Sequence, residues 1–157
     1  NGALAHERAM LWVMWSQSLD NMLDDALAEL HGTPHADDDV VLDRLGRSIM
    51  DSHAIRLLGH RQLAKQQRGL VPAEQSILKL MGSEAQQDLA ALMLETLGAV
   101  ALDQIVDSTL RFPYETDRGA VSWSDRYLFT FAGTISGGTS EIQRNIVAEQ
   151  VLGLPRG

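Results

Sequence analysis

Apolar residues recur every three or four positions along most of the chain, a spacing that predicts helices. The first predicted helix covers about residues 4–30 and ends at His31-Gly32-Thr33-Pro34, where Gly favours a C-terminal cap and Pro prevents continuation. The second begins near Asp37, in an acidic run that suits a helix N-terminus, and ends at Arg68-Gly69. Its apolar positions are Leu42, Leu45, Ile49, Leu57 and Ala64.

The third predicted helix opens with Pro72 just inside its start and Glu74 in its first turn. Residues 112–121 break the helical pattern with Pro113 and Gly119 and are expected to form the one substantial loop. The apolar stripe of the third helix is that of a long amphipathic helix and comprises Ile77, Met81, Ala85, Leu89, Leu92, Leu97 and Val100.

Two shorter helices are predicted near the end of the chain. One begins at Ser122, with Asp125 as its capping-box partner. The other begins at Ser140 after Gly137-Gly138-Thr139, with Gln143 as partner, and ends at Gly153-Leu154-Pro155. Three long and two shorter helices with short connections predict an all-α fold, an antiparallel helical bundle that forms one domain over residues 1–157.

Composition narrows the classes of function. The 157 residues carry a formal net charge of −8 and no cysteine. An acidic chain whose lysines are Lys65 and Lys79 alone is a poor match for nucleic acid or for a polybasic membrane patch. No apolar run approaches the roughly 20 residues of a membrane span. We therefore expect no nucleic-acid partner, no membrane span, no thiolate metal site and a cytoplasmic location. The start of the chain has no Met and no basic segment, and we interpret it as a cut end rather than a signal peptide.

Glu7 is the first candidate for chemistry. It lies between Leu4 and Leu11, with Met14 one turn further, so the spacing places a carboxylate on an apolar stripe. Burial there would raise the pKa of Glu7 toward neutrality, as a general base requires. The alternative is a Glu at the edge of the stripe that reaches solvent or pairs with an Arg, and the spacing alone favours this alternative.

Gly137-Gly138-Thr139 is the second candidate. Glycines allow a ligand to approach the backbone, and the free N–H groups of the helix that follows can hold an anion or a polar ring edge. The simpler interpretation is a turn between helices with Thr139 or Ser140 as N-cap, which the three residues alone favour.

Histidine and tryptophan residues are interpreted as structural. His53 and His60 lie seven residues apart on the predicted inner face of the second helix, too far apart to bind one metal ion without further ligands, so we expect core histidines and no metal site. Trp12 and Trp15 are expected to pack in the core or at an interface.

Residues 137–156 closely resemble the closing signature of the acyl-CoA dehydrogenase family, and Leu4-Ala5-His6-Glu7-Arg8-Ala9 resembles the opening of that family's C-terminal helical domain. The resemblance implies α,β-dehydrogenation of an acyl-CoA thioester in fatty acid metabolism. A Glu removes the α-proton and FAD accepts a hydride. The resemblance also implies electron transfer to an electron-transfer flavoprotein and assembly as a homo- or hetero-oligomer. The family's N-terminal helical and middle β domains would precede Asn1, so this chain alone is expected to be inactive.

Many family members carry the base in the closing signature, at the position of Gly137. A minority place it on the first helix, at the position of Glu7, and we therefore predict Glu7 as the catalytic base. By similarity, Gly138, Thr139 and Glu141 are predicted to bind FAD and Arg8 to bind substrate.

Two departures from the family affect its usual inter-subunit FAD contacts. The Arg-x-x-Phe-Gly stretch is absent after the first helix, and the Gln-x-x-Gly-Gly stretch is reduced to residues 95–99. The alternatives to an active dehydrogenase domain are a structural subunit without a base, in a hetero-oligomeric enzyme, a helical interaction module without flavin, and a flavin oxidase of the same superfamily.

Overall fold

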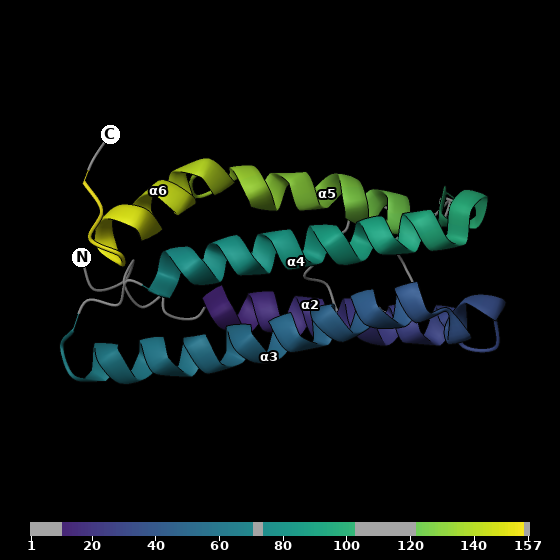
Figure 1. Ribbon diagram of the computed structural model, residues 1–157, viewed down its shortest axis with the longest axis horizontal. Helices are drawn as coiled ribbons and strands as arrows, with labels where there is room; N and C mark the ends of the chain where they lie inside the picture. The colour runs from purple at the N-terminus through teal and green to yellow at the C-terminus, as the bar shows by residue number, and fades with distance from the viewer. Residues whose placement is uncertain (1–10, 71–73, 103–121, 156–157) are drawn as a thin grey trace.

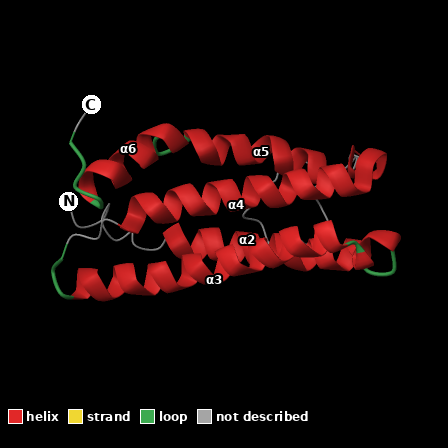
Figure 2. Cartoon of the chain, viewed as in Figure 1, coloured by secondary structure: helices red, strands yellow, loops and turns green. Residues whose placement is uncertain are grey.

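The computed structural model describes residues 11–70, 74–102 and 122–155. Five α-helices occupy most of these ranges: α2 (Leu11–Leu30), α3 (Asp39–Gln67), α4 (Glu74–Leu97), α5 (Trp123–Ile135) and α6 (Ser140–Gln150). Two short 3-10 helices, η1 (Pro34–Asp37) and η2 (Gly98–Leu102), follow α2 and α4. These ranges contain no strand, as Figure 2 shows, and the predicted all-α fold is confirmed.

The long helices alternate in direction, and α5 and α6 follow one another along one side of α4 (Figure 1). The two shorter helices thus form the fourth arm of an up-and-down bundle, broken at the turn between them. Helix α4 is central, because it packs against α2, α3, α5 and α6. The start of α2, the end of α3, the start of α4 and all of α6 consequently lie toward the same end of the bundle (Figure 1).

Most helix boundaries are those that the sequence predicts. Helix α2 ends at Leu30, and Gly32 follows with a φ of 76°. Asp38 caps α3 by accepting hydrogen bonds from the Val40 and Val41 backbone N–H groups. Ser122 caps α5 and hydrogen-bonds to Asp125 as predicted. Pro72 and the predicted loop at 112–121 lie outside the described residues.

The start of α6 differs from the predicted capping box by one residue. Thr139, not Ser140, is the N-cap, and its hydroxyl accepts a hydrogen bond from the Ile142 N–H at 3.4 Å. Gln143 is therefore not the reciprocal partner of a capping box. Its side chain turns back and donates to the Gly137 carbonyl at 2.8 Å.

The core lies where α4 meets its neighbours. Leu19 of α2, Ile55 of α3 and Leu89 and Met93 of α4 are fully buried. Dense packing of these side chains against one another stabilises the bundle. The predicted stripe of α4 is correct at Ala85, Leu89 and Leu92, whereas Val100 lies in η2 and is exposed.

The predicted apolar stripe of α3 is wrong at most positions. Leu45 is buried, but Leu42, Ile49 and Leu57 are exposed by 47%, 41% and 70%. The face of α3 that packs inward consists mainly of small and polar residues: Val41, Leu45, Ser48, Ser52, Ile55, Gly59 and Gln62. Small residues allow close approach of the neighbouring helices, and this requirement outweighs hydrophobicity on α3.

The prediction that His53 and His60 lie on the inner face of the second helix is also wrong, because both residues are exposed. The ring of His60 lies 4.9 Å from the ring of Trp12, centroid to centroid.

Met14 of α2, on the stripe predicted to contain Glu7, is 43% exposed. In the described ranges, no helix has both the length and the apolar character needed to cross a bilayer.

Candidate functional site

The break in the fourth arm is a turn that requires glycine. Gly137 has a φ of 66° and Gly138 a φ of 101°, both in the region that side chains with a Cβ adopt only with strain. The turn interrupts the helical arm between the end of α5 and the start of α6. It brings the carbonyl end of one helix beside the N–H end of the next.

Thr139 and Glu141 complete the start of α6. The Glu141 side chain is exposed, and a hydrogen bond from its own backbone N–H, then one from the Thr139 hydroxyl, lowers the pKa of its carboxyl. Glu141 is therefore ionised near neutral pH, where it complements the positive end of the helix dipole. This carboxylate also lies 3.9 Å from the Arg144 guanidinium one turn further.

Two side chains anchor the turn from the inside of the bundle. The Lys79 Nζ of α4 donates to the Gly138 carbonyl at 2.7 Å and to the Thr134 carbonyl at 3.2 Å. The Gln143 Nε2 of α6 donates to the Gly137 carbonyl. Burial lowers the pKa of Lys79, while the charges of Glu84 and Glu141 act in the opposite direction.

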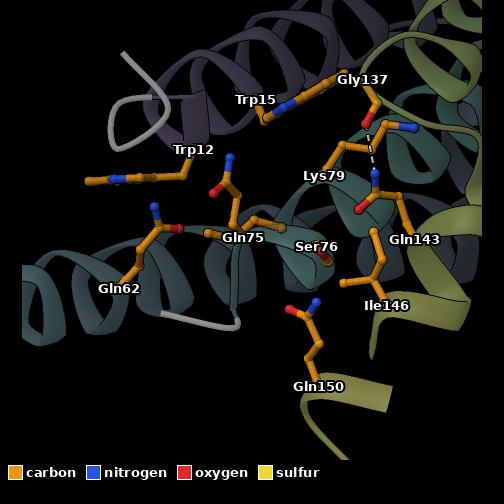
Figure 3. A pocket seen from close by; sticks show the side chains of 11 residues that line it. Trp12, Trp15, Gln62, Gln75, Ser76, Lys79, Gly137, Gln143, Ile146 and Gln150 are labelled. Atoms are coloured by element: carbon orange, nitrogen blue, oxygen red, sulfur yellow. Dashed lines mark hydrogen bonds between the residues drawn. The ribbon is translucent and has the colours of Figure 1, made fainter. Parts of the chain in front are cut away.

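A cavity of about 420 Å³ lies between the turn and the starts of α2 and α4 (Figure 3). One wall carries Gly137, Gln143 and Ile146, and the opposite wall carries Trp12 and Gln62. Among the described residues that line the cavity, Lys79 is the one with a charged side chain. A mixture of aromatic rings, amides and a single cation suits a ligand that is flat, mostly uncharged and able to form hydrogen bonds.

Polar atoms remain unpartnered on the wall opposite the turn. Gln62 is only 1% exposed, and neither its Oε1 nor its Nε2 has a hydrogen-bond partner within the described chain. The Trp12 indole Nε1 is likewise buried and unpartnered. Such atoms cost free energy unless a ligand, a water molecule or another part of the protein satisfies them.

The two tryptophans are packing residues, as predicted. A Cβ on Gly59 of α3 would lie 2.1 Å from the Trp12 Cδ2, so the indole lies directly against the backbone of α3. Trp15 lies in the same way against Gly82 of α4. Each indole occupies the space that a side chain at its glycine would need.

Three of the predicted site residues, Gly138, Thr139 and Glu141, meet at this turn. Glu7 and Arg8, the predicted base and substrate residue, lie outside the described residues. Lys79, Gln143 and Gln62 were not predicted as site residues. The sequence offers a signal only for Lys79, because a lysine is rare in this chain, which has two, and this one falls within a predicted amphipathic helix. The described parts of the chain contain no cluster of His, Asp and Glu able to hold a metal ion.

Comparison with known proteins defines the family. Residues 1–152 match the acyl-CoA dehydrogenase C-terminal domain. The chain is 32% identical over 146 residues to acyl-CoA dehydrogenase IpdE1 of Mycobacterium tuberculosis, covering 92% of this chain and 33% of that protein. It is 35% identical over 124 residues to IpdE1 of Mycolicibacterium smegmatis, covering 79% of this chain and 28% of that protein. The chain therefore belongs to the acyl-CoA dehydrogenase family, and it spans about a third of the length of these relatives.

Solved structures show the same fold. The ChsE4–ChsE5 complex from Mycobacterium tuberculosis superposes with a TM-score of 0.69 at 25% identity, over 90% of this chain and 36% of that one. The Tcur3481–Tcur3483 steroid ACAD superposes with a TM-score of 0.73 at 23% identity, over 98% of this chain and 38% of that one.

Proposed function

We propose that this chain is the C-terminal helical domain of an FAD-dependent acyl-CoA dehydrogenase and that Glu7 is its catalytic base. The observation that carries the proposal is the match of residues 1–152 to this domain. It is supported by the resemblance of the closing signature, which implies a base at the position of Gly137 in many family members. Gly137 has no proton-accepting side chain. A Glu on the first helix supplies the group that the reaction needs.

The turn at Gly137–Gly138 has the chemistry of a site for the cofactor. Thr139 presents a hydroxyl, α6 presents the positive end of its dipole, and Lys79 adds a cation behind the turn. These groups suit the polar ring edge of a flavin nucleotide, and we assign Gly138, Thr139 and Glu141 to its binding. When bound, FAD would accept the hydride from the β-carbon of the acyl group.

Glu7 and Arg8 perform the remaining steps on the substrate side. In this proposal the Glu7 carboxylate takes the α-proton of the thioester, and Arg8 binds the CoA portion. We further propose that an electron-transfer flavoprotein accepts the electrons. The proposed location of the protein is the cytoplasm.

The outer face of α3 supports assembly with a further acyl-CoA dehydrogenase subunit. This face exposes Leu42, Ile49, Met50 and Leu57, which are between 41% and 70% exposed. Several large apolar side chains exposed along one helix are typical of a subunit interface. The similar ChsE4–ChsE5 structure is described as a complex of two chains, which favours a hetero-oligomer for this protein.

The deciding experiment follows flavin bleaching in the intact native polypeptide with its partner subunit. Protein is mixed anaerobically with a panel of acyl-CoA thioesters, for wild type and Glu7→Gln. We expect bleaching by at least one thioester and a loss of at least ~10²-fold in rate for Glu7→Gln. Asp43→Asn, which removes a surface carboxylate of α3, is the matched control and should leave the rate unchanged.

A relocation variant tests the same assignment independently. Nothing lies within 4 Å of a Cβ built on Gly137, so a side chain fits there, although its φ of 66° adds strain. The double variant Glu7→Gln, Gly137→Glu should regain part of the lost rate. An unchanged rate in Glu7→Gln, or bound FAD that no thioester bleaches, would favour the structural subunit instead. Absence of FAD from the purified protein would favour the interaction module.

A further inference from the structure

Lys79 occupies an unusual position for a lysine. It belongs to α4, yet its ammonium group donates to two carbonyls of another arm of the bundle, Thr134 and Gly138. Thr134 lies in the last turn of α5, where carbonyl oxygens carry the negative end of the helix dipole. The cation thus binds one carbonyl oxygen at the end of α5 and one within the Gly137–Gly138 turn.

Gln143 holds the same turn from α6. Its side chain is 5% exposed, and its Nε2 donates to the Gly137 carbonyl at 2.8 Å. A Cβ built on Gly138 would lie 2.8 Å from this nitrogen. The turn is therefore pressed against Gln143, and two consecutive carbonyls of the turn are fixed by side chains from two different helices.

Fixing these carbonyls also fixes the direction of the next N–H groups. No peptide bond in the described ranges is cis, and in a trans peptide the C=O and the following N–H point in opposite directions. With the Gly137 carbonyl directed at Gln143, the Gly138 N–H points away from Gln143. With the Gly138 carbonyl directed at Lys79, the Thr139 N–H points away from Lys79. Two neighbouring donors are thereby directed away from the side chains that anchor the turn.

We propose that Lys79, together with Gln143, is a positioning residue that orients the Gly138 and Thr139 N–H groups toward an electron-rich group of the bound cofactor. This inference rests on the proposed function, in which the turn receives FAD. Lys79 itself does not touch the cofactor. It acts through the backbone of the turn, and it offsets the carbonyl charge of α5 that would otherwise repel an anion at the start of α6.

The test combines two measurements on the intact native polypeptide. The first is hydrogen–deuterium exchange by mass spectrometry of the peptide that spans residues 136–142, in the flavin-free protein. The second is the Kd for FAD, measured by quenching of flavin fluorescence. The variants are Lys79→Met, which keeps the length and removes the charge, Lys79→Arg, which keeps the charge, and Lys65→Met as control. Lys65 is the other lysine of the chain and pairs with Glu74 rather than with the turn.

We expect Lys79→Met to raise exchange in the turn and to weaken FAD binding by about tenfold, because the Gly138 and Thr139 N–H groups are no longer held in the binding orientation. Lys79→Arg should restore much of the affinity. Lys65→Met should lower the melting temperature without changing the Kd. Unchanged exchange in the turn of Lys79→Met would overturn the inference. Raised exchange with an unchanged Kd would overturn it also, because Lys79 would then be structural only. If wild type binds no FAD, the proposed function fails, and the exchange measurement still decides whether Lys79 holds the turn.

Discussion

The indole of Trp15 lies flat against the backbone of Gly82, so that a Cβ on this glycine would meet the Trp15 Cγ at 2.7 Å. Helices α2 and α4 owe their close contact at this point to the missing side chain. A larger residue at Gly82 would push the indole toward Gly133 of α5, whose own Cβ would lie 3.2 Å from the far edge of the same ring. Trp15 is therefore confined between two helices.

Gly82→Ala should destabilise the protein by about 1–3 kcal/mol, because the added methyl group forces the indole out of its position. The measurement is the free energy of unfolding from urea titration followed by tryptophan fluorescence. Gly46→Ala of α3 is the matched control, since nothing lies within 4 Å of its added Cβ. That variant should gain about 0.5–1 kcal/mol from helix propensity. Equal effects of the two substitutions would contradict the packing described for Trp15.

The ion pair between Asp25 of α2 and Arg126 of α5 should contribute far more than surface pairs. The Arg126 Nη2 lies 2.6 Å from the Asp25 Oδ2, and the side chains of Asp25 and Arg126 are only 15% and 13% exposed. The Arg126 guanidinium also stacks 4.7 Å above the Trp123 ring. Asp25→Asn leaves this cation unpaired in a nearly buried site and should cost roughly 3 kcal/mol.

Asp43→Asn provides the comparison for Asp25→Asn in the same unfolding experiment. It breaks the pair with Arg47, whose side chains are 61% and 70% exposed, and should cost less than about 0.5 kcal/mol. A high salt concentration should reduce the cost of Asp43→Asn and leave the cost of Asp25→Asn nearly unchanged. Similar costs for both substitutions would show that burial does not strengthen the pair of Asp25.

Glu74 gives the stability of the protein a defined dependence on acid. Burial alone would raise the pKa of Glu74, but the hydrogen bond from Lys65, its own backbone N–H and the charges of Lys65 and Arg61 outweigh burial and lower the pKa below 4.5. At pH values between the pKa of Glu74 in the folded protein and its higher pKa in the unfolded chain, the unfolded chain binds more protons. The stabilisation is therefore complete above about pH 4.5 and is lost as the pH falls through the folded-state pKa.

Glu74→Gln should lower the free energy of unfolding at pH 7 by about 1–3 kcal/mol and make the loss of stability below pH 4.5 less steep. Urea titrations at pH values from 3 to 7 measure both effects. Curves for wild type and Glu74→Gln that stay parallel down to the lowest pH would contradict a lowered pKa for this carboxyl.

A charge on the outer face of α3 should disrupt assembly. Leu57 is 70% exposed in the described chain, and Leu57→Glu would place a carboxylate in the proposed subunit interface. We expect a smaller oligomer by light scattering, with the helical circular-dichroism spectrum unchanged. Gln67→Glu adds the same charge to an exposed position of α3 and should leave the mass unchanged. An unaltered mass in Leu57→Glu would locate the interface elsewhere.

Spacing of apolar residues and local capping signals were enough to predict the helices. The stops after Leu30 and Gln67 and the cap at Ser122 depend only on neighbouring residues, which is why the sequence alone reveals them. The inner face of α3 depends on what α2 presents to it. Trp12 lies against Gly59 on the inner face, whereas Leu42, Ile49 and Leu57 are exposed, so the periodicity predicted the wrong face.

The candidate site was predictable only in part. Gly138, Thr139 and Glu141 are contiguous and form a recognisable signature. Lys79 donates a hydrogen bond to Gly138, which lies 59 positions later in the sequence, and the residues around either position do not predict this contact. The sequence predicts Gln143 as a capping residue, whereas the N-cap of α6 is Thr139 rather than Ser140, and Gln143 holds the turn instead.

Helix α6 packs mainly on α4, whereas α4 itself has partners on every side. Apart from the anchors at the turn, a further link between these two helices is the ion pair of Arg144 with Glu84, whose side chains are 53% and 34% exposed. The last arm can consequently detach in a local unfolding event that leaves the remaining helices assembled. Amide protection should therefore be lowest in α6 and highest in the middle of α4. Because ligand bound at the start of α6 would hold only the attached form, the protection of this helix reports directly on occupancy of the site.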